Sequence, residues 1–311
     1  MSDFVVKVFT MTDNQIISSE QQGQRLKAAD LVSGVVRLVS LPEVCIRVNE
    51  MMDEASTSAA DIGKVISQDT GLTARLLKIV NSSFYGFPSK IETVTRAVTV
   101  IGLRELRGLV LAASAIETFS KIPNDILNMV QFWRHSVYCG VVAQLLADRC
   151  NVLHSERLFV AGLLHDIGKL IICHRLPTEA RSVMDRLKSE KLLDFQVEQD
   201  IIGFDHADVG GELIKVWQMP SSLEYALRYH HEPAKADDYA MEVSLIHIAN
   251  AITGMAEQEL DVDVEINVQP IDPVAWDMTG LDESAIEPIL KEAGPLFIDA
   301  LESILPRGRP F

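Results

Sequence analysis

From Leu26 onward, apolar residues recur every three or four positions, and this helical period persists along most of the chain. Ile62, Val65 and Ile66 form one such stripe, directly after the helix cap Ser56-Thr57-Ser58. Turn residues such as Asp69-Thr70-Gly71 break the pattern at short intervals. Because each helix in such a pattern buries one face against its neighbours, we predict an all-α fold with many short helices.

The expected helices fall into two sets. Those before residue 120 are short, such as Thr93–Ile101 and Leu103–Ala113, and that region has no alternating strand pattern. Those after it are mostly longer, with expected spans of Ile126–Cys150, Glu156–Leu176, Pro177–Glu190, Asp205–Val216, Ser221–His230, Met241–Met255 and Ser284–Leu305. This division predicts two helical halves.

The pattern divides the chain into four segments. Residues 1–25 are expected to be a polar arm, residues 26–120 an N-terminal helical half, residues 121–257 a second helical half, and residues 258–311 an acidic arm with a C-terminal helix. The boundary at 121–124 is too short for a free linker, so the halves should pack together. Residues 260–268 alternate apolar and acidic side chains, which fits an extended arm or hairpin, or an acidic connecting loop.

Charge and composition exclude several classes of protein. The formal net charge of −16 disfavours binding to nucleic acid or to an anionic membrane. No run of about 18 apolar residues predicts a membrane span, and the N-terminus lacks the pattern of a secretory signal. None of the four cysteines forms a Cys-X-X-Cys pair. We therefore expect a cytoplasmic protein with reduced thiols.

The dipeptide His165-Asp166 stands between Gly162 and Gly168 in an apolar segment. Imidazole nitrogen and carboxylate oxygen together suit iron, manganese, zinc or nickel. Neighbouring residues on a helix point about 100° apart, so both side chains reach one ion only from an opened turn. Alternatively, Asp166 bridges two ions. The flanking glycines predict close backbone packing around this pair.

Further histidines occur within or at the ends of the expected helices. Taken alone, each is more often a satisfied core or surface histidine than a ligand, although a buried imidazole always needs a partner. The candidates that could join the His-Asp pair are His135, His206, His230 and His231.

The order of these residues resembles the HD superfamily of metal-dependent phosphohydrolases. The surrounding blocks resemble the HDOD domain, the HD-related output domain, over roughly residues 30–255. The blocks that carry this resemblance are Leu41-Pro42, Asp69-Thr70-Gly71-Leu72, Asn81–Gly86, Phe132–Ser136, Gly162–Lys169, Gly210–Leu213, Trp217–Pro220 and His230-His231-Glu232.

The resemblance implies an HD-like helical bundle, formed by residues 121–257, beside an N-terminal helical subdomain. Asp166 and Lys169 are the candidate catalytic residues. Lys169 follows the pair by about one helical turn, where it could contact a phosphate, pair with an acid or simply be an exposed helix lysine. The implied metal ligands are His135, His165, Asp166, His206, His230, His231 and Asn250. Asn250 is a departure, because the superfamily has aspartate in this place. His247, one turn earlier, could compensate for it or could simply be a core or surface histidine.

HDOD domains are regulatory modules of bacterial signalling, and many have lost the metal ligands. We therefore predict a bacterial signalling protein that retains a site for one or two divalent ions. Its expected partner is a signalling protein or a phosphate-containing small ligand. The alternative is an active phosphohydrolase or phosphodiesterase acting on a nucleotide or another phosphate ester, and the sequence leaves catalysis open. The Gly-Tyr-Pro turn of HD proteins that cleave cyclic di-GMP is missing after Glu232, so we do not predict hydrolysis of cyclic di-GMP.

A diiron oxygenase is a further alternative function.

Overall fold

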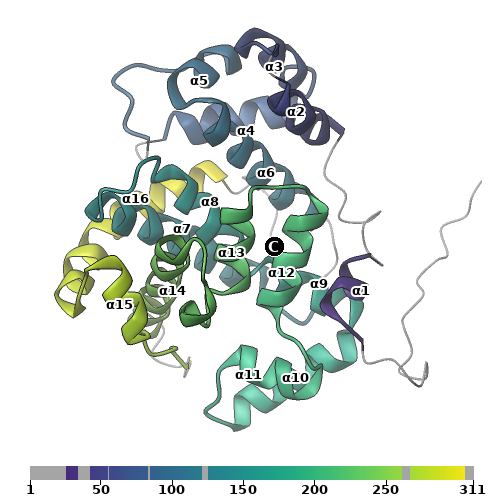
Figure 1. Cartoon of the computed structure of the whole chain (residues 1–311), viewed down its shortest axis with the longest axis vertical. Coiled ribbons are helices and arrows are strands. Elements are labelled where there is room, and N and C mark those ends of the chain that lie inside the picture. The colour runs from purple at the N-terminus through teal and green to yellow at the C-terminus, as the bar shows by residue number, and fades with distance from the viewer. Residues whose placement is uncertain are drawn as a thin grey trace, which may run out of the picture.

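The computed structural model describes residues 26–33, 43–54, 56–82, 85–120, 125–260 and 267–304. Within these ranges every regular element is helical, with sixteen α-helices and two short 3-10 helices (Figure 1). This confirms the all-α prediction. The polar arm 1–25, the boundary 121–124 and residues 261–266 of the acidic stretch lie outside the described residues.

The first part of the chain contains six helices: α1 (Ala28–Ser33), α2 (Glu43–Asp53), α3 (Ala59–Ile66), α4 (Thr70–Val80), α5 (Val94–Ile101) and α6 (Leu103–Phe119). Ser58 begins α3 with a capping box, because its hydroxyl accepts from the Asp61 amide while the Asp61 carboxylate accepts from the Ser58 amide. Asp69 caps α4 in the same region by accepting from the Leu72 amide at 2.9 Å. The cap predicted near Ser58 thus sets the start of α3, and α4 begins at the predicted break after Asp69.

The second part of the chain carries the longer helices. In chain order they are α7 (Met129–Arg149), α8 (Glu156–Leu164), α9 (Ile167–Arg175), α10 (Pro177–Ser189), α11 (Asp194–Ile201), α12 (His206–Val216), α13 (Ser221–Arg228), η1 (Pro233–Lys235), α14 (Ala240–Leu260), α15 (Pro273–Thr279), η2 (Glu283–Ala285) and α16 (Ile286–Ile304). Two of them, α11 and α15, were not expected from the sequence.

The expected single helix Glu156–Leu176 is wrong, because the chain breaks at His165 and Asp166 into α8 and α9. Close packing accompanies the break. A Cβ on Gly168 would lie 2.0 Å from the His206 carbonyl oxygen, so α9 presses directly against α12. A Cβ on Gly162 would lie 2.7 Å from the backbone of Gly140 on α7. The predicted close backbone approach at both glycines is therefore present.

The helices form two packed groups, as Figure 1 shows. Helices α2 to α5 form the upper group, and α6 lies between it and the remainder, contacting α2, α4 and α5 on one side and α8 on the other. Helix α1 is the exception, because it packs against α9 and α12 of the second group. Helix α16 returns to contact both α7 and α4. The first and last described helices, α1 and α16, thus both contact helices that lie far from them in the sequence.

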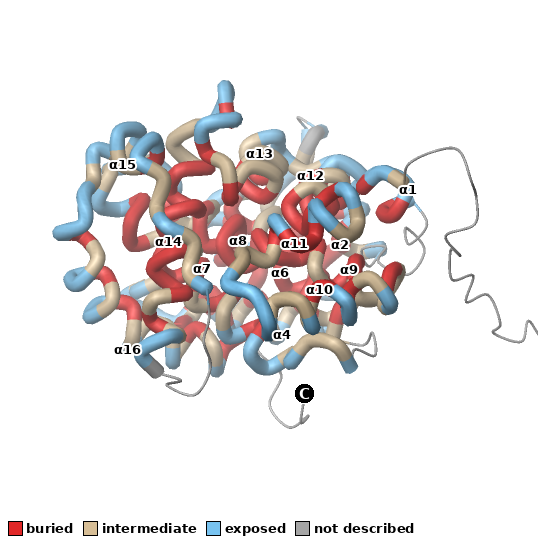
Figure 2. The backbone as a smooth tube through the Cα atoms, turned by 90° about the horizontal axis from the view of Figure 1, so that it is seen from below, coloured by how far each residue is buried: buried red, intermediate tan, exposed pale blue. Residues whose placement is uncertain are grey.

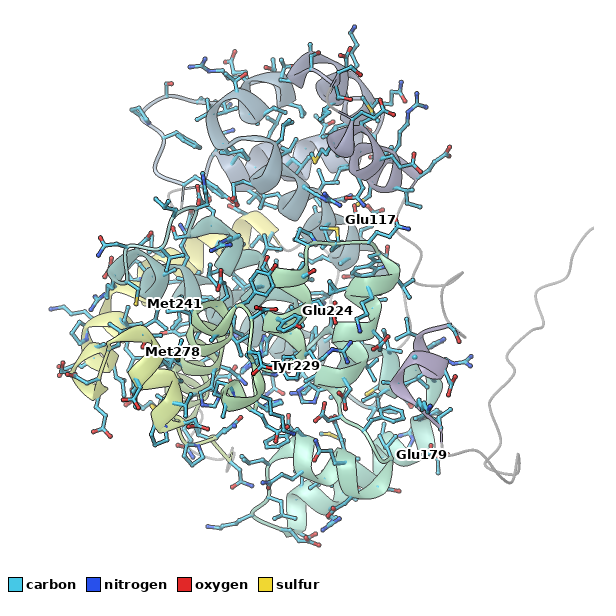
Figure 3. All side chains as sticks on the ribbon, viewed as in Figure 1. Glu117, Glu179, Glu224, Tyr229, Met241 and Met278 are labelled. Atoms are coloured by element: carbon cyan, nitrogen blue, oxygen red, sulfur yellow. The ribbon has the colours of Figure 1, made fainter. Side chains whose placement is uncertain are left out.

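Buried residues concentrate along α7, α8 and α14, which pack on one another in the middle of the molecule (Figure 2). Figure 3 draws the side chains on the helices and labels Glu224 of α13. Arg228 on α13 donates to Glu224 at 3.2 Å and to Glu212 of α12 at 2.7 Å, which ties these two helices together. No helix in the described part of the chain has the length and apolar character needed to cross a bilayer.

Candidate metal centre

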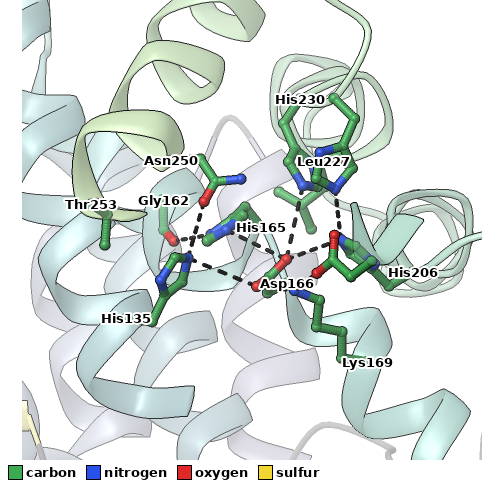
Figure 4. A network of polar contacts seen from close by, with 12 residues as sticks. His135, Gly162, His165, Asp166, Lys169, His206, Leu227, His230, Asn250 and Thr253 are labelled. Carbon is green, nitrogen blue, oxygen red and sulfur yellow. Dashed lines mark hydrogen bonds and ion pairs between the residues drawn. The ribbon is translucent and has the colours of Figure 1, made fainter. Parts of the chain in front are cut away.

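Five segments of the second group bring the predicted ligands to one place (Figure 4). His135 comes from α7, His165 and Asp166 from the break between α8 and α9, and Asn250 from α14. The N-terminus of α12 supplies His206, and the segment between α13 and η1 supplies His230 and His231. Five of these side chains are almost fully enclosed, with exposures of 0% for His165, His206 and His230, 4% for Asp166 and 7% for His231.

Backbone carbonyls fix the tautomers of two buried rings. The Nδ1–H of His165 donates to the Gly162 carbonyl at 2.7 Å, and the Nδ1–H of His230 donates to the Leu227 carbonyl at 2.6 Å. Burial lowers the pKa of His165 to about 4, and burial next to His231 holds the pKa of His230 well below its ordinary value. Both rings are therefore neutral, with a lone pair on each Nε2. Neither Nε2 has a hydrogen-bond partner.

The two carboxylate oxygens of Asp166 have different surroundings. Oδ1 lies 3.1 Å from His206 Nε2, 3.4 Å from His165 Nε2 and 3.8 Å from His230 Nε2. Oδ2 accepts from the Lys169 ammonium at 2.7 Å, and the same ammonium lies 2.5 Å from Asp194. Burial opposes ionisation of Asp166, but His165, Lys169 and His206 together hold its pKa well below the usual range. Asp166 is thus a buried carboxylate that directs one oxygen at three imidazoles.

His206 and His231 face each other through their Nε2 atoms, 2.8 Å apart. The Nδ1 of His206 donates to Glu198 at 2.6 Å, and the Nδ1 of His231 donates to Gln269 at 2.7 Å. Gln269 is oriented by its own donation to the His231 carbonyl at 2.7 Å. Two neutral rings with protonated Nδ1 atoms would point two lone pairs at each other. Burial opposes a charge on His206, but the Glu198 and Asp166 carboxylates raise its pKa well above the ordinary value, so a proton on its Nε2 joins the rings when no metal is bound. Such a contact is stable only when a proton or a metal ion lies between them.

A second facing pair involves His135, which is half-buried. Its Nδ1 lies 3.0 Å from the Glu257 carboxylate, and its Nε2 lies 3.0 Å from the amide oxygen of Asn250. The Asp166 Oδ2 atom is 3.9 Å from the same Nε2. Burial opposes a charge on this ring, but the Glu257 carboxylate raises the pKa of His135. The protonated ring donates from Nδ1 to Glu257 and from Nε2 to the Asn250 amide oxygen.

These donors satisfy the requirements of a divalent ion. Ligand atoms within 4.8 Å of one another occur in two groups, one made of Asp166, His206, His230 and His231 and the other of His135, His165 and Asp166. Buried polar atoms normally have partners, yet His165 Nε2, His230 Nε2 and Asp166 Oδ1 have no hydrogen bond. Nitrogen and oxygen donors of this kind suit iron, manganese, zinc or nickel. The cluster therefore fits a metal, and its occupancy stays a prediction.

His247 does not compensate for Asn250. Its Nδ1–H donates to the His230 carbonyl at 2.7 Å, and its Nε2 accepts from the Asp272 amide at 2.9 Å. Both ring nitrogens are thus already used. His247 is a core histidine that holds the backbone of a candidate ligand in place.

Sequence reasoning missed four polar residues that surround the cluster. Asp194 and Glu198 come from α11, Glu257 from the end of α14, and Gln269 from the segment before α15. Each contacts a candidate ligand or Lys169 directly. Partners of this kind fix the ring orientation and tautomer of metal-binding histidines. No local motif marks them, because the fold alone brings them to the site.

A helical bundle that holds a His-Asp pair at a helix break, with further histidines converging on it, defines an HD-type helical protein. The sequence pattern of the HDOD domain matches residues 38–233, and the chain belongs to the HDOD domain family.

Solved structures agree with this assignment at the level of the fold. An HDOD domain protein of unknown function from Geobacter sulfurreducens has a TM-score of 0.71 and 23% identity, over 90% of this chain and 99% of that one. A protein from Shewanella amazonensis, provisionally named a phosphohydrolase, has a TM-score of 0.68 and 21% identity, over 90% and 99% of the two chains. At these identities the similarity establishes the shared fold.

A curated relative is an uncharacterized protein from Treponema pallidum (strain Nichols). It is 26% identical over 238 residues, which are 74% of this chain and 45% of the relative. The chain thus spans less than half the length of that relative.

Proposed function

We propose that the protein is a regulatory HDOD module of bacterial signalling that holds a divalent ion in its His-Asp cluster. The observation that carries this proposal is the set of buried ring nitrogens that converge on one carboxylate oxygen of Asp166. His165 Nε2, His230 Nε2 and Asp166 Oδ1 lack hydrogen bonds, and His206 faces His231 at 2.8 Å. A buried polar atom without a partner is costly, and a bound cation would remove that cost for all of them.

The bound ion would act as a cross-link within the second group of helices. Its ligands come from the break between α8 and α9, the start of α12 and the segment after α13. The proposed partner of the protein is a cytoplasmic signalling protein or a phosphate-containing small ligand. The supporting argument is membership of a family of signalling modules, together with a metal site that has little access to solvent.

Metal analysis tests this proposal directly. The protein would be purified, freed of metal with a chelator, and loaded separately with iron(II), manganese(II), zinc(II) and nickel(II). We expect at least one of these ions to remain bound through gel filtration, and to be lost in His165→Ala. His174→Ala is the matched control, because His174 lies on α9 outside the cluster and should leave binding unchanged. No retained metal with any of the four ions would refute the proposal.

One observation favours catalysis as a second candidate function. The Lys169 ammonium lies beside Asp166 and is partly exposed, with a side-chain exposure of 20%. In this position it could contact a phosphate group next to the candidate metal ligands. A bound ion would supply a polarised phosphoryl oxygen and a more acidic water, while Lys169 would bind and orient the phosphate.

Turnover of model phosphodiesters and nucleotides by the metal-loaded protein tests this alternative. An active phosphohydrolase should lose activity in Lys169→Met while keeping its metal. Lys188→Met is the control, because Lys188 is an exposed residue of α10. Absence of turnover at full metal occupancy would exclude the catalytic alternative and leave the regulatory proposal in place.

A further inference from the structure

We infer that the cluster holds one ion, bound on the Oδ1 side of Asp166 and enclosed by protein ligands, while the His135–Asn250 side holds none. This inference rests on the proposed function, because it assumes that the cluster binds metal. It adds the number of ions, their position and the role of the ion in the fold.

The first argument is the asymmetry of Asp166, the residue shared by the two ligand groups. Its Oδ1 faces the Nε2 atoms of three histidines at 3.1 to 3.8 Å. Its Oδ2 is engaged by the Lys169 ammonium at 2.7 Å. A carboxylate that joins two ions through its two oxygens needs both of them. Asp166 has one oxygen to offer, and the cation already at the other oxygen repels a second ion.

The second argument is the quality of the donors on the two sides. The Oδ1 side collects the three imidazoles of His206, His230 and His231, each with an exposure of 7% or less, and His165 Nε2 also lies 3.4 Å from Oδ1. The opposite side has His135 and the neutral amide of Asn250, and shares His165. An amide oxygen carries no net charge to offset a dication, so this side binds cations far more weakly. His135 is also more open to water than the three imidazoles of the Oδ1 side, with a side-chain exposure of 20%.

The third argument is the enclosure of the Oδ1 side. The three imidazoles and one carboxylate oxygen of this group supply four ligands, the number that closes a tetrahedral site without water. Structural metal sites are closed by protein ligands, whereas catalytic sites keep an open position. The inferred ion is therefore structural. It joins α8, α9, α12 and the segment after α13, and it stabilises the folded state over the unfolded chain.

The test combines the metal content of each variant with its thermal unfolding, using the metal that the wild-type protein retains best. We expect one ion per chain in the wild-type protein and in His135→Ala, and none in His206→Ala or His231→Ala. Chelation should lower the Tm of the first two proteins by roughly 5 to 10 °C and leave the other two unchanged. His206→Gln replaces His206→Ala if the smaller side chain prevents folding, which circular dichroism would show.

The opposite results are equally clear. Two ions in the wild-type protein and one in His135→Ala would overturn the inference, as would retention of the ion in His206→Ala and its loss in His135→Ala. An ion whose removal leaves the wild-type Tm unchanged would overturn the structural role. Absence of metal from all the proteins would refute the proposed function itself, so the two failures are distinguishable.

Discussion

His206 and His231 bring their Nε2 atoms to 2.8 Å from each other, while the Nδ1 of each ring donates to an oxygen acceptor. Neither ring can rotate to relieve this contact without losing its bond to Glu198 or Gln269. The surrounding structure therefore holds two nitrogen donors in place for a shared proton or a shared cation. A preorganised pair of this kind binds more tightly than one that must first be ordered.

Replacing Asn250 by aspartate should create a second ion position. The new carboxylate would face His135 Nε2, which now lies 3.0 Å from the amide oxygen, and would supply the charge that this side lacks. We expect Asn250→Asp to raise the metal content from one ion per chain to two, measured by elemental analysis after equilibration. Asn151→Asp, in an exposed turn, is the control. An unchanged content in Asn250→Asp would show that the amide is not what limits the second position.

Replacing Glu198 by glutamine should weaken metal binding without removing a ligand. The Glu198 carboxylate accepts from both the Nδ1 and the backbone amide of His206, at 2.6 and 2.8 Å. Loss of such a partner typically lowers metal affinity by about 10- to 100-fold. Competition with a chromogenic chelator would measure this change. Glu190→Gln, at an exposed ion pair with Arg186, should leave affinity unchanged, and equal affinities for the two variants would contradict the prediction.

Gly168→Ala should destabilise the protein, because the new methyl group would meet the His206 carbonyl oxygen at 2.0 Å. The clash is with the backbone of His206, whose displacement would cost free energy. We expect a loss of about 2 to 4 kcal/mol in the free energy of unfolding, as for other overpacked positions. Gly294→Ala is the matched control, because a Cβ added at that position in α16 would meet no heavy atom within 4 Å. Its stability should change by less than about 1 kcal/mol.

Urea unfolding of the two glycine variants, with metal removed, would measure both effects. Equal stabilities would mean that α9 and α12 are free to separate at Gly168, contrary to the packing that the structure shows.

The four cysteines should react at different rates, and none of them is in a disulfide. Burial raises the pKa of Cys45 to about 11, although Ser114 and Arg107 favour its thiolate, and burial raises the pKa of Cys139 well above its ordinary value. A thiol reacts as its thiolate, so at pH 8 both should be nearly inert in the folded protein. Cys150 and Cys173 are half-buried and should react first.

Titration with a disulfide reagent at pH 8 would check this prediction. We expect two fast thiols in the native protein and four after denaturation. Cys45→Ser should leave the fast phase unchanged, and a reduced fast phase would show that Cys45 is accessible.

The sequence was most informative where local signals and tertiary contacts agree. The cap predicted near Ser58 sets the start of α3, and α4 begins at the predicted break after Asp69. The opened turn required by His165 and Asp166 is also present, although the apolar pattern there predicts one unbroken helix. That break accompanies the contact of Gly168 with α12, which is distant in sequence. Periodicity within one segment carries no information about such a contact.

The candidate site shows the same limit. Histidines stand out in a sequence, so the structure finds the predicted ligands together. Asp194 and Glu198 do not stand out, because they belong to α11, a short helix with a mostly polar sequence. Their roles depend on Lys169 and His206, which lie on other helices. Likewise, His247 could be assigned to the core only when its contacts with His230 and Asp272 were known.

Helix α12 has the candidate metal centre at one end and a contact with α6 at the other. His206 is its first residue, and the turn that ends it presents the Gln218 carbonyl to Arg107 of α6 at 2.9 Å. Because Gly168 leaves no side chain between α9 and α12, the two helices are in backbone contact beside the His-Asp turn. A movement of His206 would therefore be carried along α12 toward its contact with α6.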